Sequence, residues 1–175
     1  YRVEAANYAM ASGTATVTIL AKEMTANMLS VEPSGTTYTG EEVTATVTVK
    51  DGSKTLQQGT DYTIDENSTL QATDAGSYTI KVNGAGNYSG SQEIRWTITE
   101  ADMEVTAEDV TATYDGNGYS INVENEPEDA VVTYATSQYG DYTTENPSFT
   151  EAGIHTVYYR VEAANYAMAS GTATV

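Results

Sequence analysis

Apolar and polar residues alternate along most of this chain in the pattern of short β-strands. In residues 43–49, valine or alanine occupies every second position and threonine fills the positions between. Successive side chains of a strand point to opposite faces, so such a stretch has one apolar and one polar face. Residues 76–82, 94–99 and 119–123 alternate in the same way, and short turns rich in Gly, Asn and Asp separate them. No stretch of a dozen residues has a helical period, so the pattern predicts an all-β protein.

A long exact repeat organises the chain. Residues 1–17 and 159–175 are identical, which sets a period of 159 − 1 = 158 residues. A weaker repeat lies inside that period, because the Thr-Ile pair at 18–19 returns at 97–98, a shift of 97 − 18 = 79 residues. Repeats on this scale are typical of modules arranged in series. The chain therefore resembles a window of a tandem array.

The two repeats together define the expected domains. Residues 24–101 form one module, and residues 102–175 form a second, related module whose last strand is cut short. Residues 1–23 are the terminal hairpin and linker of a preceding module of the second kind. The linkers at 20–23 and 100–102 contain neither Gly nor Pro, so we expect a restricted angle between modules and a rod-like arrangement.

Each module reads as about seven short strands with one apolar face and with turns every 8–12 residues. This pattern is typical of an Ig-like β-sandwich, in which two apolar faces close a thin core. Aligning the modules places the lone histidine of the chain where the first module has a core tyrosine. We expect the core to include Tyr78, Trp96, Ile98, His155, Val157 and Tyr159.

Charge and cysteine content exclude several classes of partner. The net charge is −18, and only 7 basic residues face 25 acidic ones. Nucleic-acid binding needs clustered Lys and Arg, so no nucleic-acid partner is expected. No apolar run has transmembrane length, and no membrane insertion is expected in this window. The chain has no Cys, which rules out disulfides and thiolate metal sites.

Residues 76–90, Gly-Ser-Tyr-Thr-Ile-Lys-Val-Asn-Gly-Ala-Gly-Asn-Tyr-Ser-Gly, are followed by Trp-Thr-Ile at 96–98. Together with residues 105–116 and 158–161, they resemble the bacterial Ig-like repeats, of the MBG type, found in large Gram-positive cell-surface proteins. The resemblance implies secretion, attachment at the cell wall or cell surface, and an adhesin or stalk role. It brings no catalytic residues.

Few residues suggest chemistry. Tyr139 and Tyr142 lie in a loop that has no match in the first module, and exposed tyrosines can stack on sugar rings. They are the candidate ligand residues. Glu100, Asp102 and Glu104 at the linker are weak Ca²⁺ candidates, since Ca²⁺ prefers oxygen ligands, but their spacing matches no known calcium loop. No other cofactor is expected. No nucleophile motif or phosphate loop is present, and the chain is not expected to be an enzyme.

These observations predict a structural repeat unit, a stalk or spacer, of a secreted or wall-anchored surface adhesin. The alternative is that the repeats themselves bind a glycan or host protein multivalently. The expected partners are neighbouring repeats in series. Residues 1–20 carry the full terminal hairpin without a module body, so head-to-tail strand exchange through this segment is a further expectation.

Overall fold

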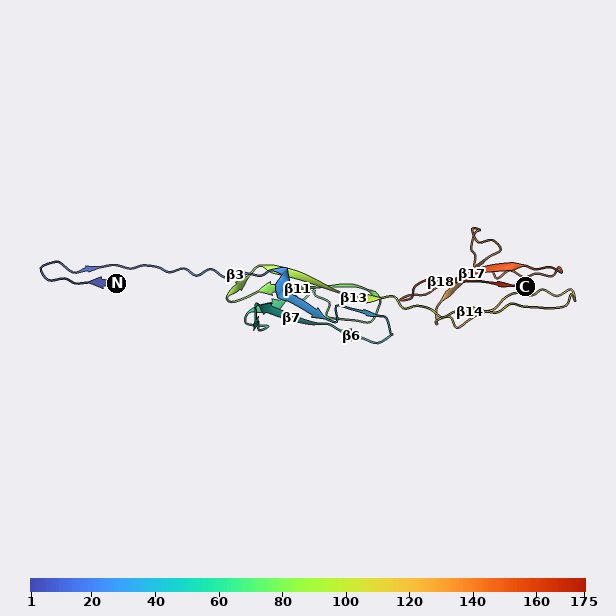
Figure 1. The fold of residues 1–175 in the computed structure, drawn as a ribbon, viewed down its shortest axis with the longest axis horizontal. Coiled ribbons are helices and arrows are strands. Elements are labelled where there is room, and N and C mark those ends of the chain that lie inside the picture. The colour runs from blue at the N-terminus through green and yellow to red at the C-terminus, as the bar shows by residue number, and fades with distance from the viewer. The chain divides into compact units, whose positions relative to one another are not determined.

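The computed structural model describes all residues, 1–175, and its regular structure is almost entirely β (Figure 1). This confirms the all-β class. The one helical element is a short 3₁₀ turn, η1 (Ala26–Met28). The strands are β1 (Arg2–Val3), β2 (Ala11–Ser12), β3 (Lys22–Glu23), β4 (Leu29–Glu32), β5 (Gly35–Thr37), β6 (Val43–Thr44), β7 (Thr46–Asp51), β8 (Lys54–Thr55), β9 (Tyr62–Ile64), β10 (Gln71–Ala72), β11 (Gly76–Gly84), β12 (Tyr88–Ser89), β13 (Ser91–Thr99), β14 (Thr106–Ala107), β15 (Val123–Glu124), β16 (Val131–Ala135), β17 (Thr156–Glu162) and β18 (Ala169–Thr174).

These strands form several small sheets, which is consistent with a β-sandwich. The largest has the order β5-β13-β11-β9, and two three-stranded sheets have the orders β4-β7-β8 and β16-β17-β18. The remaining sheets are the pairs β1-β2, β6-β10, β3-β12 and β14-β15. Most pairs are antiparallel, but β5 runs parallel to the end of β13, with Ile98 opposite Thr36.

The chain divides into two compact units, each assembled from separated segments. The first comprises Tyr1–Ser30, Thr48–Ser68 and Ile80–Ile94, and the second comprises Val31–Val47, Thr69–Thr79 and Arg95–Val175. The boundaries expected from the repeat, after residues 23 and 101, are repeat boundaries and stay a prediction. No helix of the structure is long and apolar enough to cross a membrane.

The first unit has its own apolar core. Met24, Val49, Ile80 and Val82 are almost completely buried. Their alternation with polar residues along β7 and β11 is the pattern read from the sequence. Burial of such side chains contributes about 1.5–3 kcal/mol each.

The second unit contains two clusters of buried side chains. Trp96 is fully buried; its indole Nε1 donates a hydrogen bond to the Thr69 carbonyl at 2.8 Å, and its ring lies 4.8 Å from that of Tyr78. The other cluster gathers residues of β15, β17 and β18 together with Ile121, which precedes β15. It consists of Ile121, Val123, Val157, Tyr159, Val161 and Ala173.

The residues expected in the core divide into two groups. Trp96, Ile98, Val157 and Tyr159 are buried. Tyr78 and His155 are half-buried, and each bonds the backbone carbonyl four residues before it. The Tyr78 hydroxyl donates to the Asp74 carbonyl at 2.6 Å, and His155 Nε2 lies 3.0 Å from the Glu151 carbonyl. The histidine therefore repeats the local contact of the aligned tyrosine.

The duplicated stretch has one hairpin register in two different environments. Arg2 lies opposite Ser12, and Arg160, 158 residues later, lies opposite Ser170. Within the second unit β16 pairs with this hairpin, and Val161 is fully buried. Figure 1 shows β1 and β2 with no third strand at their side, and Val3 is 57% exposed. The seventeen residues thus set their own register, whereas burial depends on the strands that cover them.

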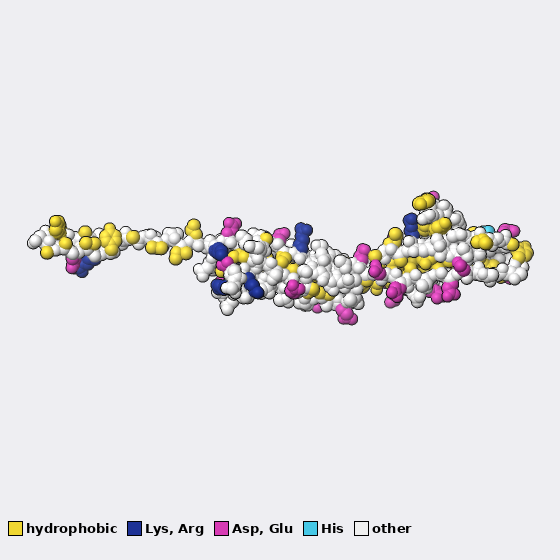
Figure 2. Space-filling view, viewed as in Figure 1, with side chains coloured by type: hydrophobic (Ala, Val, Ile, Leu, Met, Phe, Trp, Pro, Cys, Tyr) yellow, Lys and Arg dark blue, Asp and Glu magenta, His cyan; other side chains and the backbone are white.

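The segment before β3 exposes many apolar side chains, which Figure 2 shows along its length. Val17, Ile19 and Leu20 are each at least 85% exposed.

Acid is expected to loosen the end of β18 through Asp109. Its carboxylate accepts the backbone N–H of Thr174 at 2.7 Å, and this bond lowers the pKa of Asp109 below its ordinary value. The stabilisation is therefore complete above the unfolded pKa of about 3.9 and is lost as the pH falls through the lower folded pKa. NMR titration of Asp109 should give a lower midpoint in the folded chain than in the urea-unfolded chain. Equal midpoints would contradict this assignment, and Asp109→Asn should remove the step.

Candidate functional site

The loop at 136–146 carries both candidate ligand tyrosines. It leaves the end of β16 and returns to it, because the backbone groups of Tyr134 and Thr143 bond each other at 2.7 and 3.0 Å. On the neighbouring strand β17, Tyr159 points into the core. Side chains alternate along a strand, so Tyr158 and Arg160 point to the opposite face.

The loop and this face of the sheet together form a cavity, which we call the tyrosine cavity. The guanidinium carbon of Arg160 lies 3.8 Å from the centre of the Tyr142 ring, and the Tyr142 hydroxyl donates to the Gln138 carbonyl at 3.3 Å. A stacked cation of this kind contributes about 0.5–2 kcal/mol, depending on desolvation. The volume of the cavity is about 250 Å³. Its lining residues are Gln138, Tyr139, Tyr142, Tyr158, Tyr159, Arg160, Ser170, Gly171 and Thr172.

The two predicted ligand residues therefore line one cavity. Tyr139 is 91% exposed, and Tyr142 is half-buried beneath its contact with Arg160. The sequence reasoning missed Tyr158 and Arg160. The alternation of side chains along the strand could have shown that Tyr158 and Arg160 share the face opposite the buried Tyr159. Nothing in the sequence showed that the loop at 136–146 crosses that face.

The lining of the tyrosine cavity suits a sugar that carries a negative charge. Tyrosine rings offer apolar faces and hydroxyl groups, and the guanidinium offers planar paired donors for a carboxylate or sulfate. Arg160 is the one charged residue in the lining. The cavity therefore has a positively charged lining, although the net charge of the chain is −18.

Apart from Tyr159, the other residues selected from the sequence do not line this cavity. Glu100, Asp102 and Glu104 are exposed, and the structure brings no three carboxylate or imidazole groups together as a metal site. The His155 ring stacks on Phe149, with centroids 4.4 Å apart and planes 6° from parallel.

A further set of polar contacts centres on Asn165, which joins the linker at Ala101 and the turn at Asp74 and Ala75. The Ala101 N–H donates to the Asn165 carbonyl at 3.0 Å, and the Ala167 N–H donates back to the Ala101 carbonyl at 2.9 Å. The Asn165 side chain accepts the Ala75 N–H at 2.7 Å and donates to Asp74 at 3.1 Å. Residues about ninety positions apart are thereby tied together.

The first unit contains the same linker pairing. Lys22 donates its N–H to the Asn87 carbonyl at 2.9 Å, and β3 runs parallel to β12 with Lys22 opposite Tyr88. In the second unit Ala101 lies opposite Tyr166, also in parallel. The shifts, 101 − 22 = 79 and 166 − 88 = 78 residues, agree with the internal repeat.

Comparison of the chain with protein-family models, with curated proteins and with solved structures gave no match.

Proposed function

We propose that this chain is a structural repeat unit, a stalk or spacer, of a secreted or wall-anchored bacterial surface adhesin. The observation that carries the proposal is the recurring linker pairing. Both linkers, around Lys22 and Ala101, run parallel to an Asn-Tyr hairpin near the end of the module that each linker opens. A chain that uses the same short connection at each module boundary is suited to placing modules in series, so that the number of repeats sets the reach.

The contacts of Asn165 and Tyr166 support a stiff connection. Asn165 bonds both Asp74 and Ala75, and the Tyr166 ring meets the Tyr38 ring edge-on with centroids 5.5 Å apart. Aromatic pairs of this geometry add about 0.5–1.5 kcal/mol beyond their burial. A stalk needs such contacts, because a flexible linker would not hold a distal domain at a fixed distance.

Spin-label distances test the stiffness. The chain has no Cys, so Thr46→Cys with Glu145→Cys gives two defined labels at exposed positions. We expect a narrow distance distribution that broadens in Asn165→Ala. The matched control is Asn7→Ala, because Asn7 has the same sequence neighbours and a similar backbone, with φ 67° against 71° for Asn165. A broad distribution in the unsubstituted junction would overturn the stalk proposal.

A second candidate function rests on the tyrosine cavity. Its Arg160–Tyr142 stack and exposed Tyr139 favour binding of an acidic glycan by each repeat. Serial repeats would then add affinity through multivalency.

Arg160→Ala and Tyr142→Ala are each expected to weaken acidic-glycan binding about tenfold or more. The first removes the charge and the stack together, and the second removes the ring that holds the guanidinium in place. A glycan array followed by titration calorimetry measures the effect. Arg2→Ala is the matched control, because Arg2 occupies the same place in the duplicated sequence and bonds Glu4 instead. Binding that is equal in all variants, or absent from the unsubstituted chain, excludes this site.

A further inference from the structure

Two Asn-Gly pairs occur in the chain, and the structure places them in opposite environments. Glycine follows Asn83 and Asn117 and no other asparagine. The backbone nitrogen after an asparagine can attack the carboxamide carbon, and glycine hinders this attack least, because it has no side chain and the widest backbone freedom. Whether a pair reacts then depends on whether the fold lets the glycine nitrogen and the carboxamide meet.

Asn83-Gly84 lies at the end of β11, where hydrogen bonds fix the backbone. Asn83 lies opposite Thr63 of β9, and the Gly84 N–H donates to the Gly90 carbonyl at 2.9 Å. Both residues of the pair are half-buried. A Cβ on Gly84 would lie only 2.7 Å from the backbone nitrogen of Ser89, so neighbouring backbone packs closely against the pair. The nitrogen that would attack is therefore held inside the sheet.

Asn117-Gly118 lies outside every strand, and both of its residues are exposed. The Gly118 N–H takes part in no backbone hydrogen bond. One hydrogen bond holds the carboxamide of Asn117, since its Nδ2 donates to Asp115 Oδ2 at 2.8 Å. A single hydrogen bond between exposed groups is readily exchanged for bonds to water. The Asn117 carboxamide and the Gly118 nitrogen are therefore free to meet.

The adjacent Asp115-Gly116 pair does not share this reactivity. A carboxylate is a poor target for an amide nitrogen, because its oxygen leaves only when it is protonated. The backbone N–H of Asn117 donates to Asp115 Oδ1 at 2.9 Å, and this bond holds the pKa of Asp115 below its ordinary value. Asp115 is therefore ionised at neutral pH, which leaves Asn117 as the reactive residue of the turn.

We infer that Asn117 is a site of spontaneous deamidation in the folded protein. The Gly118 nitrogen attacks Cγ of Asn117, and the new C–N bond closes a succinimide ring. The bond from Cγ to Nδ2 breaks, and Nδ2 leaves as ammonia with the proton that the Gly118 nitrogen gives up. Solvent water then opens the ring at either carbonyl, so that residue 117 becomes an aspartyl or an isoaspartyl residue.

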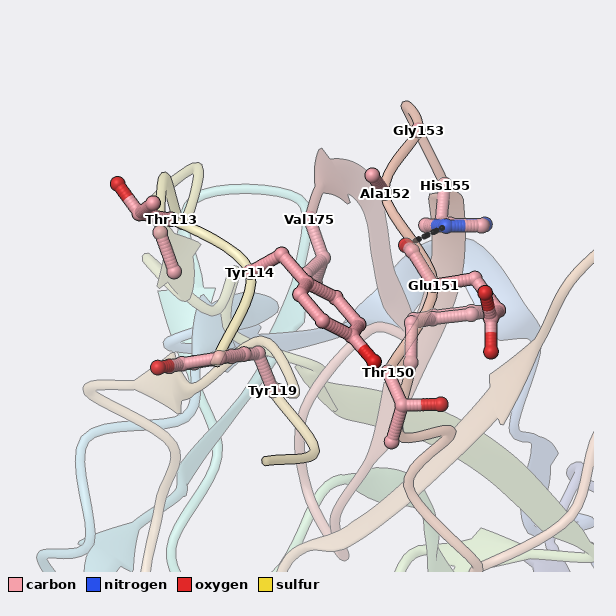
Figure 3. Close-up of a pocket in the computed structure, with 11 residues that line it drawn as sticks. Thr113, Tyr114, Tyr119, Thr150, Glu151, Ala152, Gly153, His155 and Val175 are labelled. Carbon is pink, nitrogen blue, oxygen red and sulfur yellow. Dashed lines mark hydrogen bonds between the residues drawn. The ribbon is translucent and has the colours of Figure 1, made fainter. Parts of the chain in front are cut away.

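The product alters the turn that holds Asn117. Asp115 Oδ2 accepts hydrogen bonds from Asn117 Nδ2 at 2.8 Å and from the Tyr119 hydroxyl at 2.9 Å. Figure 3 shows the Tyr119 ring pointing away from Glu151 and His155. Deamidation removes the Nδ2 donor and places a second carboxylate beside Asp115, so two like charges face each other and only Tyr119 still donates. The modified turn is therefore looser and more acidic than the original one.

This inference goes beyond the stalk proposal, because it needs only the local geometry of residues 115–119 and leaves the Asn165 junction unchanged. Peptide mapping by mass spectrometry tests it on the full chain during prolonged incubation at slightly alkaline pH. The mapping detects the mass gained when a carboxamide becomes a carboxyl group, and enzymatic methylation detects isoaspartyl residues.

In the folded chain, Asn117 is expected to react about tenfold or more faster than Asn83. Attack at Asn83 first requires the Gly84 hydrogen bond and the pairing with β9 to open, and such openings in a sheet are rare. In urea neither pair is held, so the two rates should become similar. An Asn117 that stays intact in the folded chain, or one that reacts no faster than Asn83, would overturn the inference.

Matched variants identify the source of the ammonia. Asn117→Gln keeps a carboxamide, but its longer side chain would have to close a less favourable ring, so this variant should release much less ammonia than the unsubstituted chain. Asn83→Gln is the control and should release almost as much ammonia as the unsubstituted chain. Far-UV circular dichroism verifies that both variants remain folded. Equal release from Asn117→Gln and the unsubstituted chain would place the reaction elsewhere and exclude Asn117 as the site.

Discussion

Val161→Asp is expected to unfold the core around β15, β17 and β18, whereas Val3→Asp leaves the protein almost unchanged. The two valines occupy the same position in the identical seventeen-residue stretch, but Val161 is fully buried and Val3 is 57% exposed. An unpaired carboxylate among Ile121, Val157 and Ala173 has no hydrogen-bond partner and costs more than about 4 kcal/mol. A small domain has a total stability of only about 5–15 kcal/mol.

Urea unfolding followed by circular dichroism measures the difference between these variants, and the fluorescence of Trp96 shows how far the unfolding spreads. Trp96 is the only tryptophan and lies before the expected boundary at residue 101. If the modules 24–101 and 102–175 fold separately, Val161→Asp leaves the emission of Trp96 unchanged. Emission that shifts to that of a solvated indole would contradict the boundary, and equal effects of Val161→Asp and Val3→Asp would contradict the burial argument.

The strands of this protein could be predicted because alternation is a local property. Val49 is the buried residue of β7, and Ile80 and Val82 are buried in β11, as the alternation of their sequences predicts. The hairpin register of the duplicated stretch is also local, since β1-β2 and β17-β18 share it with and without a covering strand. Turn chemistry and side-chain periodicity are therefore sufficient to predict the strands and the hairpin register.

Neighbours across the sheets could not be predicted in the same way. The parallel pairing of β5 with β13 joins residues more than sixty positions apart, and alternation is the same whichever strand lies alongside. The contact of Arg160 with Tyr142 also depends on where a loop crosses a sheet face. Sequence reasoning selected Tyr142 because its loop has no match in the other module, but it had no basis for choosing Arg160 as its partner.

His155 shows where the alignment of modules was informative. The sequence placed it at the position of Tyr78, and both side chains bond a backbone carbonyl four residues earlier. Their aromatic neighbours differ, because Tyr78 packs on Trp96 whereas His155 stacks on Phe149. Val175 occupies the position that aligns with Trp96. A smaller residue at that position leaves room beside His155. Phe149, which bridges Tyr119 as Ala72 pairs with Val43 in β10 and β6, brings its ring to His155 there.

Trp96→Ala is expected to destabilise the part of the chain around β11 and β13 by about 3–5 kcal/mol, the usual cost of removing a large buried aromatic side chain. Trp96 is fully buried, packs on Tyr78 and bonds the Thr69 carbonyl, so the substitution leaves a cavity and an unpaired carbonyl together. Trp96→Phe keeps most of the packing and loses the hydrogen bond, and it should cost less than half as much. The neighbouring Arg95→Ala is the control, because Arg95 is exposed on the same strand and should change stability by less than about 0.5 kcal/mol.

Urea unfolding followed by circular dichroism replaces fluorescence here, since the variant lacks the fluorophore. A loss below about 1 kcal/mol in Trp96→Ala would mean that this side chain does not hold the module together, and separate folding predicts that Tyr159 and Val161 stay protected from hydrogen exchange in the variant.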